Sequence, residues 1–359
     1  MGRKFYYPLN YRRWRNRMKR KVAKLISPKT FVIEQEEIAP LKKDEVLVKI
    51  EACGICHTEM STYLGESVTI IEGLENYRFQ KEIPYPVELG HEPSGIILDI
   101  GSEVKNFKIG DRVGGPIDGS FASHVVTIPK KLVKIPDSIK NPEYCLAEPL
   151  GCISNMVRTA RPEYGDFVAV IGCGTMGLLT LSALKQMPLQ GLIAIDLQDS
   201  RLQWAKKFGA QITLNPKRDD CEQFIQDLTH NRGVDVAIEI TGKLKGLEMA
   251  SLIIRNASFY GYQGRGRIIA SSFYAGDQIM SNTLGYQLMF KSPIVASVHP
   301  WHSLNFMEDV AKGVWGYQKH FLPLDQLITH KFCLEDLAKG FETASGKDTD
   351  YLKGVIIME

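Results

Sequence analysis

The 359-residue sequence lacks several features that would place it outside the globular proteins of the cell interior. It has no low-complexity linker and no internal repeat. Its first residues also lack the pattern of a signal peptide, which is a basic stretch followed by an apolar stretch and a cleavage site of small residues. We therefore expect a cytoplasmic protein without a secretory signal. Its seven cysteines are an odd number, which in a chain of this length argues against a disulfide framework. We therefore expect free or metal-bound thiols.

Long hydrophobic runs are also scarce. Only residues 167–184 imitate a membrane span, with 18 residues that carry no charge, which is the lower limit for a transmembrane helix. This stretch contains Gly172, Gly174 and Gly177, so it is better interpreted as a strand, a tight turn and the start of a helix. We expect no membrane partner.

Acidic residues are absent from residues 1–17, which hold six basic side chains, whereas the other 342 residues carry a net charge of −3. A basic arm with tyrosines and a tryptophan could bind RNA or an anionic membrane surface. We expect instead that the arm faces solvent or packs on the body, or that translation starts at Met18. The rest of the chain is mildly acidic, so its electrostatic potential would not attract nucleic acid.

Two sequence patterns follow one another along the chain. From about Met18 to Ile135, short alternating strands are broken by glycine and proline. From Phe167, apolar strands alternate with helical patterns, which predicts a doubly wound parallel sheet with crossover helices. The expected fold class is α/β, with a cleft between two domains as the site. The predicted divisions are an extension at 1–17, a β-rich domain at 18–154 and 300–359, and a nucleotide domain at 155–299.

Three helices are predicted within the second pattern, and a loop is predicted near the C-terminus. The helices cover about 176–185, 200–208 and 221–230. Strands follow near 266–274 and 292–298. After a further helix beyond Trp301, residues 321–330 are expected to form a loop before a last helix and a closing strand.

A glycine-rich motif, "VIGCGTMG", directly follows an apolar strand and opens a helix. Gly172 allows the tight turn, Gly174 lets a pyrophosphate approach the backbone, and Gly177 permits close packing of helix on strand. The phosphates would lie at the helix N-terminus. We expect Thr175 and Met176, within the motif, to contact the cofactor as well.

The second strand of this pattern ends at Asp196, 19 residues beyond Gly177. A carboxylate there can accept hydrogen bonds from ribose hydroxyls and would repel a 2′-phosphate, which favours NAD over NADP. Arg201 lies close enough in sequence to stack on adenine or to weaken that preference.

A set of metal-ligating residue types occurs in the first half of the chain. Cys53 and Cys56 have a C-x-x-C spacing, but neither a thioredoxin-like unit nor a second cysteine pair accompanies them. His91 and Glu92 follow in "LGHEPSG", and Glu148 in "LAEPLG". One thiolate, one imidazole and one or two carboxylates suit Zn²⁺, and an open fourth position would mark a catalytic site.

These motifs together resemble the zinc-dependent medium-chain dehydrogenase/reductase family, which includes alcohol and polyol dehydrogenases. The resemblance covers about residues 20–359, with "GICHTE", "GHEPSG", "GDRV", "AEPLG", "VIGCGTMG" and "GVDVAIEITG" in the family's order. It implies a GroES-like β-rich catalytic domain, a Rossmann domain that binds NAD, and a small-molecule alcohol or carbonyl substrate. It also implies a homo-oligomer, a dimer or a tetramer.

The resemblance assigns roles to residues around the metal. Cys56 and His91 match the first two zinc ligands. Glu148 stands where polyol dehydrogenases of the family have a glutamate and its alcohol dehydrogenases a cysteine. Glu92 is either a ligand or a neighbouring carboxylate that exchanges onto the metal, so the third ligand remains open between these two glutamates.

Further roles are implied beside Cys56. Glu59 would orient His91, Thr58 would relay the substrate proton, and His57 would contact the cofactor pyrophosphate. Cys53 is expected to be a packed strand residue. Ser61 stands where some members carry a histidine that ends the proton relay.

Two departures from the family pattern change the expectations. The four-cysteine lobe of the structural zinc has no counterpart between His91 and Phe121, so one catalytic Zn²⁺ per chain is expected. The segment near 66–84 makes the spacing between Cys56 and His91 longer than in the family, and we expect it near the cleft, where it would shape substrate choice.

The predicted reaction is hydride transfer between a secondary alcohol and NAD, and Glu148 favours polyols, sugars or cyclitols. Simple alcohols or aldehydes are the alternative, and a non-enzymatic nucleotide-bound or RNA-associated protein is a more remote one. His299, Trp301 and His302 would line the cleft or a subunit contact. The same two options apply to Phe121 and His124.

Overall fold

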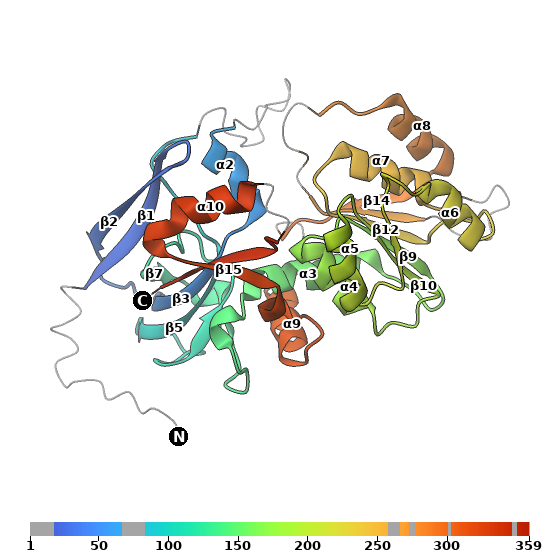
Figure 1. Cartoon of the computed structure of the whole chain (residues 1–359). Coiled ribbons are helices and arrows are strands. Elements are labelled where there is room, and N and C mark those ends of the chain that lie inside the picture. The colour runs from blue at the N-terminus through green and yellow to red at the C-terminus, as the bar shows by residue number, and fades with distance from the viewer. Residues whose placement is uncertain are drawn as a thin grey trace.

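A computed structural model describes residues 18–66, 83–257, 266–272, 274, 278–300, 303–346 and 350–358 (Figure 1). The basic arm at 1–17, most of the segment near 66–84, and Trp301 and His302 lie outside the described residues. None of the helices in the described part of the chain combines the length and the hydropathy that a membrane span needs. Residues 167–184 form a strand, a turn and a helix, as predicted.

The second half of the chain builds a parallel sheet, with strand order β11-β10-β9-β12-β13-β14. The order reverses between β9 and β12, where an open α/β sheet presents its ligand crevice at the carboxyl ends of the strands. Every residue of β9 and β10 is buried, because helices cover both faces (Figure 1). The strands are β9 (Phe167–Ile171), β10 (Gly191–Ile195), β11 (Ile212–Leu214), β12 (Val236–Glu239), β13 (Arg267–Ala270) and β14 (Ile294–Ser297).

The helices around this sheet confirm the predicted crossover pattern and add to it. They are α3 (Ala147–Ala160), α4 (Thr175–Leu184), α5 (Asp199–Lys207), α6 (Cys221–Leu228), α7 (Leu244–Ile253), α8 (Asn282–Lys291) and α9 (Phe306–Gln318). Helices α3 and α9 cross closely, since a Cβ on Gly313 would lie 2.4 Å from the Leu150 carbonyl carbon. This crossing fixes the helix that carries Glu148.

The remaining strands form two mainly antiparallel sheets. The first pairs β2 (Thr30–Glu37), β1 (Lys19–Ser27) and β4 (Val87–Glu88). The second runs in the order β15-β16-β3-β5-β6-β8, with β7 also paired to β3. Its strands are β3 (Val46–Gly54), β5 (Glu92–Ile100), β6 (Arg112–Gly114), β7 (His124–Thr127), β8 (Val133–Lys134), β15 (Ile328–Cys333) and β16 (Lys353–Ile357).

Strand β16 brings the C-terminal part of the chain back to the first domain, as the sequence predicted. It pairs with β3 in the register Val355 opposite Gly54. Short helices α2 (Met60–Leu64) and α10 (Leu337–Ser345) complete this half, together with 3₁₀ turns at His57–Glu59, Pro129–Lys131, Pro142–Tyr144, Leu324–Leu327 and Leu334–Asp336.

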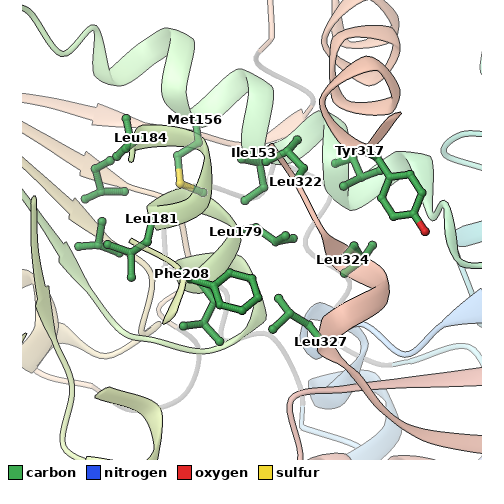
Figure 2. Packing of buried hydrophobic residues seen from close by; sticks show 14 of the residues in the cluster. Ile153, Met156, Leu179, Leu181, Leu184, Phe208, Tyr317, Leu322, Leu324 and Leu327 are labelled. Carbon is green, nitrogen blue, oxygen red and sulfur yellow. The ribbon is translucent and has the colours of Figure 1, made fainter. Parts of the chain in front are cut away.

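One predicted loop is wrong. Residues 321–330 contain a 3₁₀ turn at Leu324–Leu327 and the start of β15, which pairs in parallel with β16. The run is anchored by Leu322, Leu324 and Leu327, which pack against α3, α4 and α9 in one continuous core (Figure 2). Tertiary burial therefore orders a stretch whose proline and short apolar runs resemble a loop.

Candidate functional site

The predicted metal ligands lie where β3 ends and β5 begins. Cys56 immediately precedes the 3₁₀ turn His57–Glu59. His91 precedes Glu92, the first residue of β5. One donor atom each from Cys56, His91 and Glu92 lie within 4.8 Å of one another. Sulfur, imidazole nitrogen and carboxylate oxygen are the donors that Zn²⁺ takes in proteins, so this set fits the metal.

Glu59 holds the imidazole of His91. Its Oε1 lies 3.2 Å from His91 Nδ1 and accepts a hydrogen bond of 2.6 Å from the Gly90 backbone N–H. Glu59 is buried. When Nδ1–H donates to this carboxylate, Nε2 is unprotonated and free to ligate a metal.

Lys353, at the start of β16, was not anticipated from the sequence. Its ammonium contacts the Glu92 carboxylate and donates a hydrogen bond of 2.9 Å to the Ile55 carbonyl. The Lys353 and Glu92 side chains are only 7% and 2% exposed. The available signal was a lysine at the start of an otherwise apolar closing strand.

Gly54 was also missed, although it stands in the "CGIC" motif. A Cβ at this position would lie 2.1 Å from Glu92 Oε2 and 3.0 Å from Lys353 Cε. The buried ion pair therefore requires glycine at the end of β3. This requirement depends on two segments that are remote in sequence, so the motif alone could not show it.

Glu148 lies beside this cluster but outside the compact group of three donors. It is buried in the first turn of α3, and the Cys152 thiol, one turn further on, donates to its Oε1 over 3.2 Å. Burial and the neighbouring Glu92 charge raise the pKa of Glu148 to about 7. The carboxylates of Glu92 and Glu148 and the Cys56 thiol thus share one site with the Lys353 ammonium. These groups can carry more negative than positive charge, so the site suits an added divalent cation.

Thr58 and His57 lie at the exposed side of the cluster. The Thr58 hydroxyl donates to Cys56 Sγ over 3.1 Å. Phe121, in contrast, is fully buried, and its ring meets Phe341 edge-on. It therefore belongs to a hydrophobic core and lines no cleft. His124 lies on β7 opposite Lys49 of β3.

The glycine-rich turn has the predicted geometry. Gly172 has φ +98°, in the left-handed region that favours glycine. A Cβ on Gly177 would lie 1.9 Å from the Gly172 carbonyl oxygen, so helix and strand pack as closely as predicted. A Cβ on Gly174 would meet no protein atom within 4 Å. Nothing in the described protein explains that glycine, and the open space fits a pyrophosphate at the start of α4.

Asp196 follows β10 and is held by two backbone N–H groups. Its Oδ2 accepts from Cys173 at 2.7 Å and its Oδ1 from Gln198 at 2.8 Å. The carboxylate therefore also fixes the glycine-rich turn, a role that the sequence did not suggest. Each oxygen keeps a lone pair for a further donor.

Thr175 and Arg201 make contacts that sequence analysis did not predict. The Thr175 hydroxyl donates to the Leu352 carbonyl over 2.7 Å, and the Arg201 guanidinium donates to the Tyr351 carbonyl. The Thr175 hydroxyl proton is thus already used, whereas its backbone N–H lies in the first turn of α4. Met176 is half-buried and packs against the core shown in Figure 2.

Two protein families match separate parts of the chain. Residues 42–137 match the alcohol dehydrogenase GroES-like domain, and residues 175–267 match the zinc-binding dehydrogenase domain. The first of these covers Cys56, His91 and Glu92, and the second covers most of the helices and strands around the glycine-rich turn. Together they span just over half of the sequence.

Characterised relatives cover nearly the whole chain. It is 29% identical to (R,R)-butanediol dehydrogenase of Bacillus subtilis, over 88% of this chain and 93% of the relative. It is 25% identical to sorbitol dehydrogenase of the same organism, over 94% and 96%. The crystal structure of 2R,3R-butanediol dehydrogenase from Bacillus subtilis superimposes with a TM-score of 0.77 at 26% identity, covering 94% of this chain and 99% of that one.

Proposed function

This chain belongs to the zinc-dependent medium-chain dehydrogenase family, and we propose that it oxidises a secondary alcohol group of a polyol, sugar or cyclitol with NAD. It is an oxidoreductase that acts on CH–OH groups. The observation that carries the proposal is the compact group of Cys56, His91 and Glu92 donor atoms, in the same chain as the open glycine-rich turn.

We assign Cys56 and His91 as metal ligands in every state of the site, with Glu59 fixing the imidazole. When bound, Zn²⁺ supplies a Lewis acid that polarises an oxygen of the substrate. Proximity alone favours Glu92 as the third ligand. Electrostatics favours Glu148, because Glu92 already pairs with Lys353 whereas burial raises the pKa of Glu148 to about 7. We assign Glu148, with Glu92 as the carboxylate that exchanges.

The proton released on oxidation would leave through Thr58. Its hydroxyl lies 3.1 Å from Cys56 Sγ and is exposed, so it can accept a proton from the substrate side and release one toward solvent. NAD supplies the hydride acceptor.

The glycine-rich turn and Asp196 are assigned to the cofactor. Backbone N–H groups at the start of α4 would bind the pyrophosphate, which can approach at Gly174 because no side chain stands there. Asp196 would accept hydrogen bonds from the ribose hydroxyls and repel a 2′-phosphate. We assign His57 to the pyrophosphate and Arg201 to the adenosine end.

The substrate class rests on Glu148 and on the relatives. Butanediol and sorbitol, named in two of them, both carry more than one hydroxyl group. A simple alcohol or aldehyde is the alternative substrate. We further propose that the domains divide between residues 154 and 155 and between residues 299 and 300. We also propose a cytoplasmic location, and the finding that all seven cysteines are free supports it.

We propose that two copies associate through β14. This strand is the edge of the parallel sheet, and its Ile294 and Val295 are 48% and 47% exposed. Helix α8 adds an exposed aromatic pair, Tyr286 and Phe290. An exposed apolar edge strand can pair with another edge, and a second copy of this chain supplies one.

The test is NADH formation from pools of polyols, sugars, cyclitols and simple alcohols by the zinc-loaded protein. We expect one polyol, sugar or cyclitol pool to react, with NADP much less effective than NAD and with the rate lost in Cys56→Ala. Turnover of simple alcohols alone would contradict the substrate class. No turnover in any pool would contradict the proposed reaction.

A further inference from the structure

Two consecutive carbonyl groups join the nucleotide domain to the residues that directly precede β16, the last strand of the catalytic domain. The Leu352 carbonyl accepts from the Thr175 hydroxyl at 2.7 Å, at the start of α4. The preceding Tyr351 carbonyl accepts from the Arg201 guanidinium, on α5. Both donors follow the strand ends that we assign to the cofactor. The segment is therefore held at both the pyrophosphate and the adenosine end of that site.

The next residue joins the same segment to the metal ligands. The Lys353 ammonium contacts the Glu92 carboxylate and donates to the Ile55 carbonyl, one residue before Cys56. Three successive residues thus contact both halves of the proposed active site.

This segment has little freedom to adjust one contact without the others. Leu352 and Lys353 are each 6% exposed. The Leu352 N–H donates to Thr329 Oγ1 at 3.0 Å, and the Gly354 N–H donates to the Tyr351 hydroxyl at 2.9 Å. A displacement of the Leu352 carbonyl must move the Lys353 Cα, because the planar peptide joins them. Close packing transmits that shift.

We propose that Tyr351–Lys353 couples cofactor binding to metal binding, with Thr175 as a positioning residue that acts through Leu352. The proposal rests on the function proposed above. Glu92 pairs with Lys353 and is also the carboxylate that exchanges onto a metal held by Cys56 and His91, so that exchange shifts Lys353 and the carbonyl before it. Metal and cofactor then change each other's affinity by one common factor, as linkage requires, and we propose that the change is an increase.

The test is the dissociation constant of NADH, measured by fluorescence on the full-length protein with zinc and after removal of zinc. Coupling between sites typically changes affinity about 5- to 150-fold, and we expect the wild-type ratio of the two constants to lie in this range. Thr175→Val removes the hydroxyl at constant shape and should lower the ratio at least about threefold. Thr175→Ser keeps the hydroxyl and should preserve the ratio.

Thr180→Val is the matched control, because the Thr180 hydroxyl donates to the Met176 carbonyl within the same helix and contacts no part of the segment. Its ratio should equal that of the wild type. A ratio also unchanged in Thr175→Val would overturn the coupling. If Thr175→Val fails to fold, Arg201→Met tests the hydrogen bond to the Tyr351 carbonyl instead. The ratio of the two NADH constants should again fall at least about threefold, and an unchanged ratio would again overturn the coupling.

Failure of the proposed function gives a different result. A wild-type protein that retains no zinc or binds no NADH would refute that function, and the coupling with it. A wild-type protein that binds both, with equal NADH constants in the two states, would refute the coupling alone.

Discussion

Lys353 and Glu92 form a buried ion pair although 261 residues separate them along the chain. The pair joins the first residue of β16 to the first residue of β5, directly beside the proposed metal ligands. Its members come from chain segments that precede and follow the parallel sheet in sequence. The pair can therefore form only after the C-terminal part of the chain has returned.

Lys353→Met should destabilise the protein by about 3–5 kcal/mol, because it leaves a buried carboxylate without its cation. Urea unfolding of the zinc-free protein measures this. Lys131→Met is the control, since Lys131 pairs with Asp118 at the surface, where the side chains are 39% and 81% exposed. It should cost less than about 1 kcal/mol. Equal effects of the two variants would contradict the importance of the buried pair.

Gly174→Ala should separate folding from cofactor binding. A Cβ there meets no protein atom within 4 Å, so the unfolding free energy should stay within about 0.5 kcal/mol of the wild type. The same methyl group would stand where the pyrophosphate approaches, and NADH affinity should fall at least about tenfold. Gly285→Ala is the control for NADH affinity, because it also adds a methyl group in open space, on α8, which lies apart from α4 (Figure 1). Unchanged NADH affinity in Gly174→Ala would remove the turn from the cofactor site.

Val295→Lys should convert the proposed dimer to a monomer. The added charge lies on the exposed edge strand β14, where two copies would place it against its own counterpart. Light scattering after gel filtration gives the mass directly. The surface variant Lys245→Ala, on α7, should leave the mass unchanged. A wild-type monomer, or a variant that stays dimeric, would rule out this interface.

His124, predicted to lie at the cleft or at a subunit contact, also gives a prediction about stability. Burial, with a smaller contribution from Lys49, lowers the pKa of His124 from 6.5 to about 4. The unfolded chain therefore binds the extra proton between these values, so stability is complete above pH 6.5 and falls as the pH drops toward 4. With allowance for partial exposure, His124→Gln should remove about 1–2 kcal/mol of this loss. Parallel pH profiles for variant and wild type would show that His124 has no part in it.

The sequence predicted the parallel sheet well because its strands are buried on both faces and read as apolar runs. "FVAVI" and "GLIAI" are examples, and each became a fully buried strand. The turn around Gly172 was equally predictable, since a tight turn and a close helix–strand contact each leave a glycine in the motif. The strand at Ile328–Cys333 was not predicted, because its partner β16 lies 20 residues further on and its own apolar pattern is short.

The candidate site was predictable only in its local part. Cys56, His91, Glu92 and Glu148 are marked by residue type and spacing, whereas Lys353 depends on the pairing of β16 with β3. Thr175 shows the same limit. Its place in the glycine-rich motif predicted a cofactor contact, but the hydrogen bond of its hydroxyl to Leu352 depends on how the two domains pack.

The central claim is that a single zinc, held by Cys56, His91 and a buried glutamate, is required for NAD-linked oxidation. The most direct measurement is a zinc titration of the metal-stripped enzyme, followed by NADH formation from its polyol substrate. We predict that activity rises linearly to a break at one zinc per chain, and that Glu148→Gln needs at least about 100-fold more free zinc. Activity that is complete without zinc, or that Glu148→Gln regains at the wild-type zinc concentration, would contradict the account.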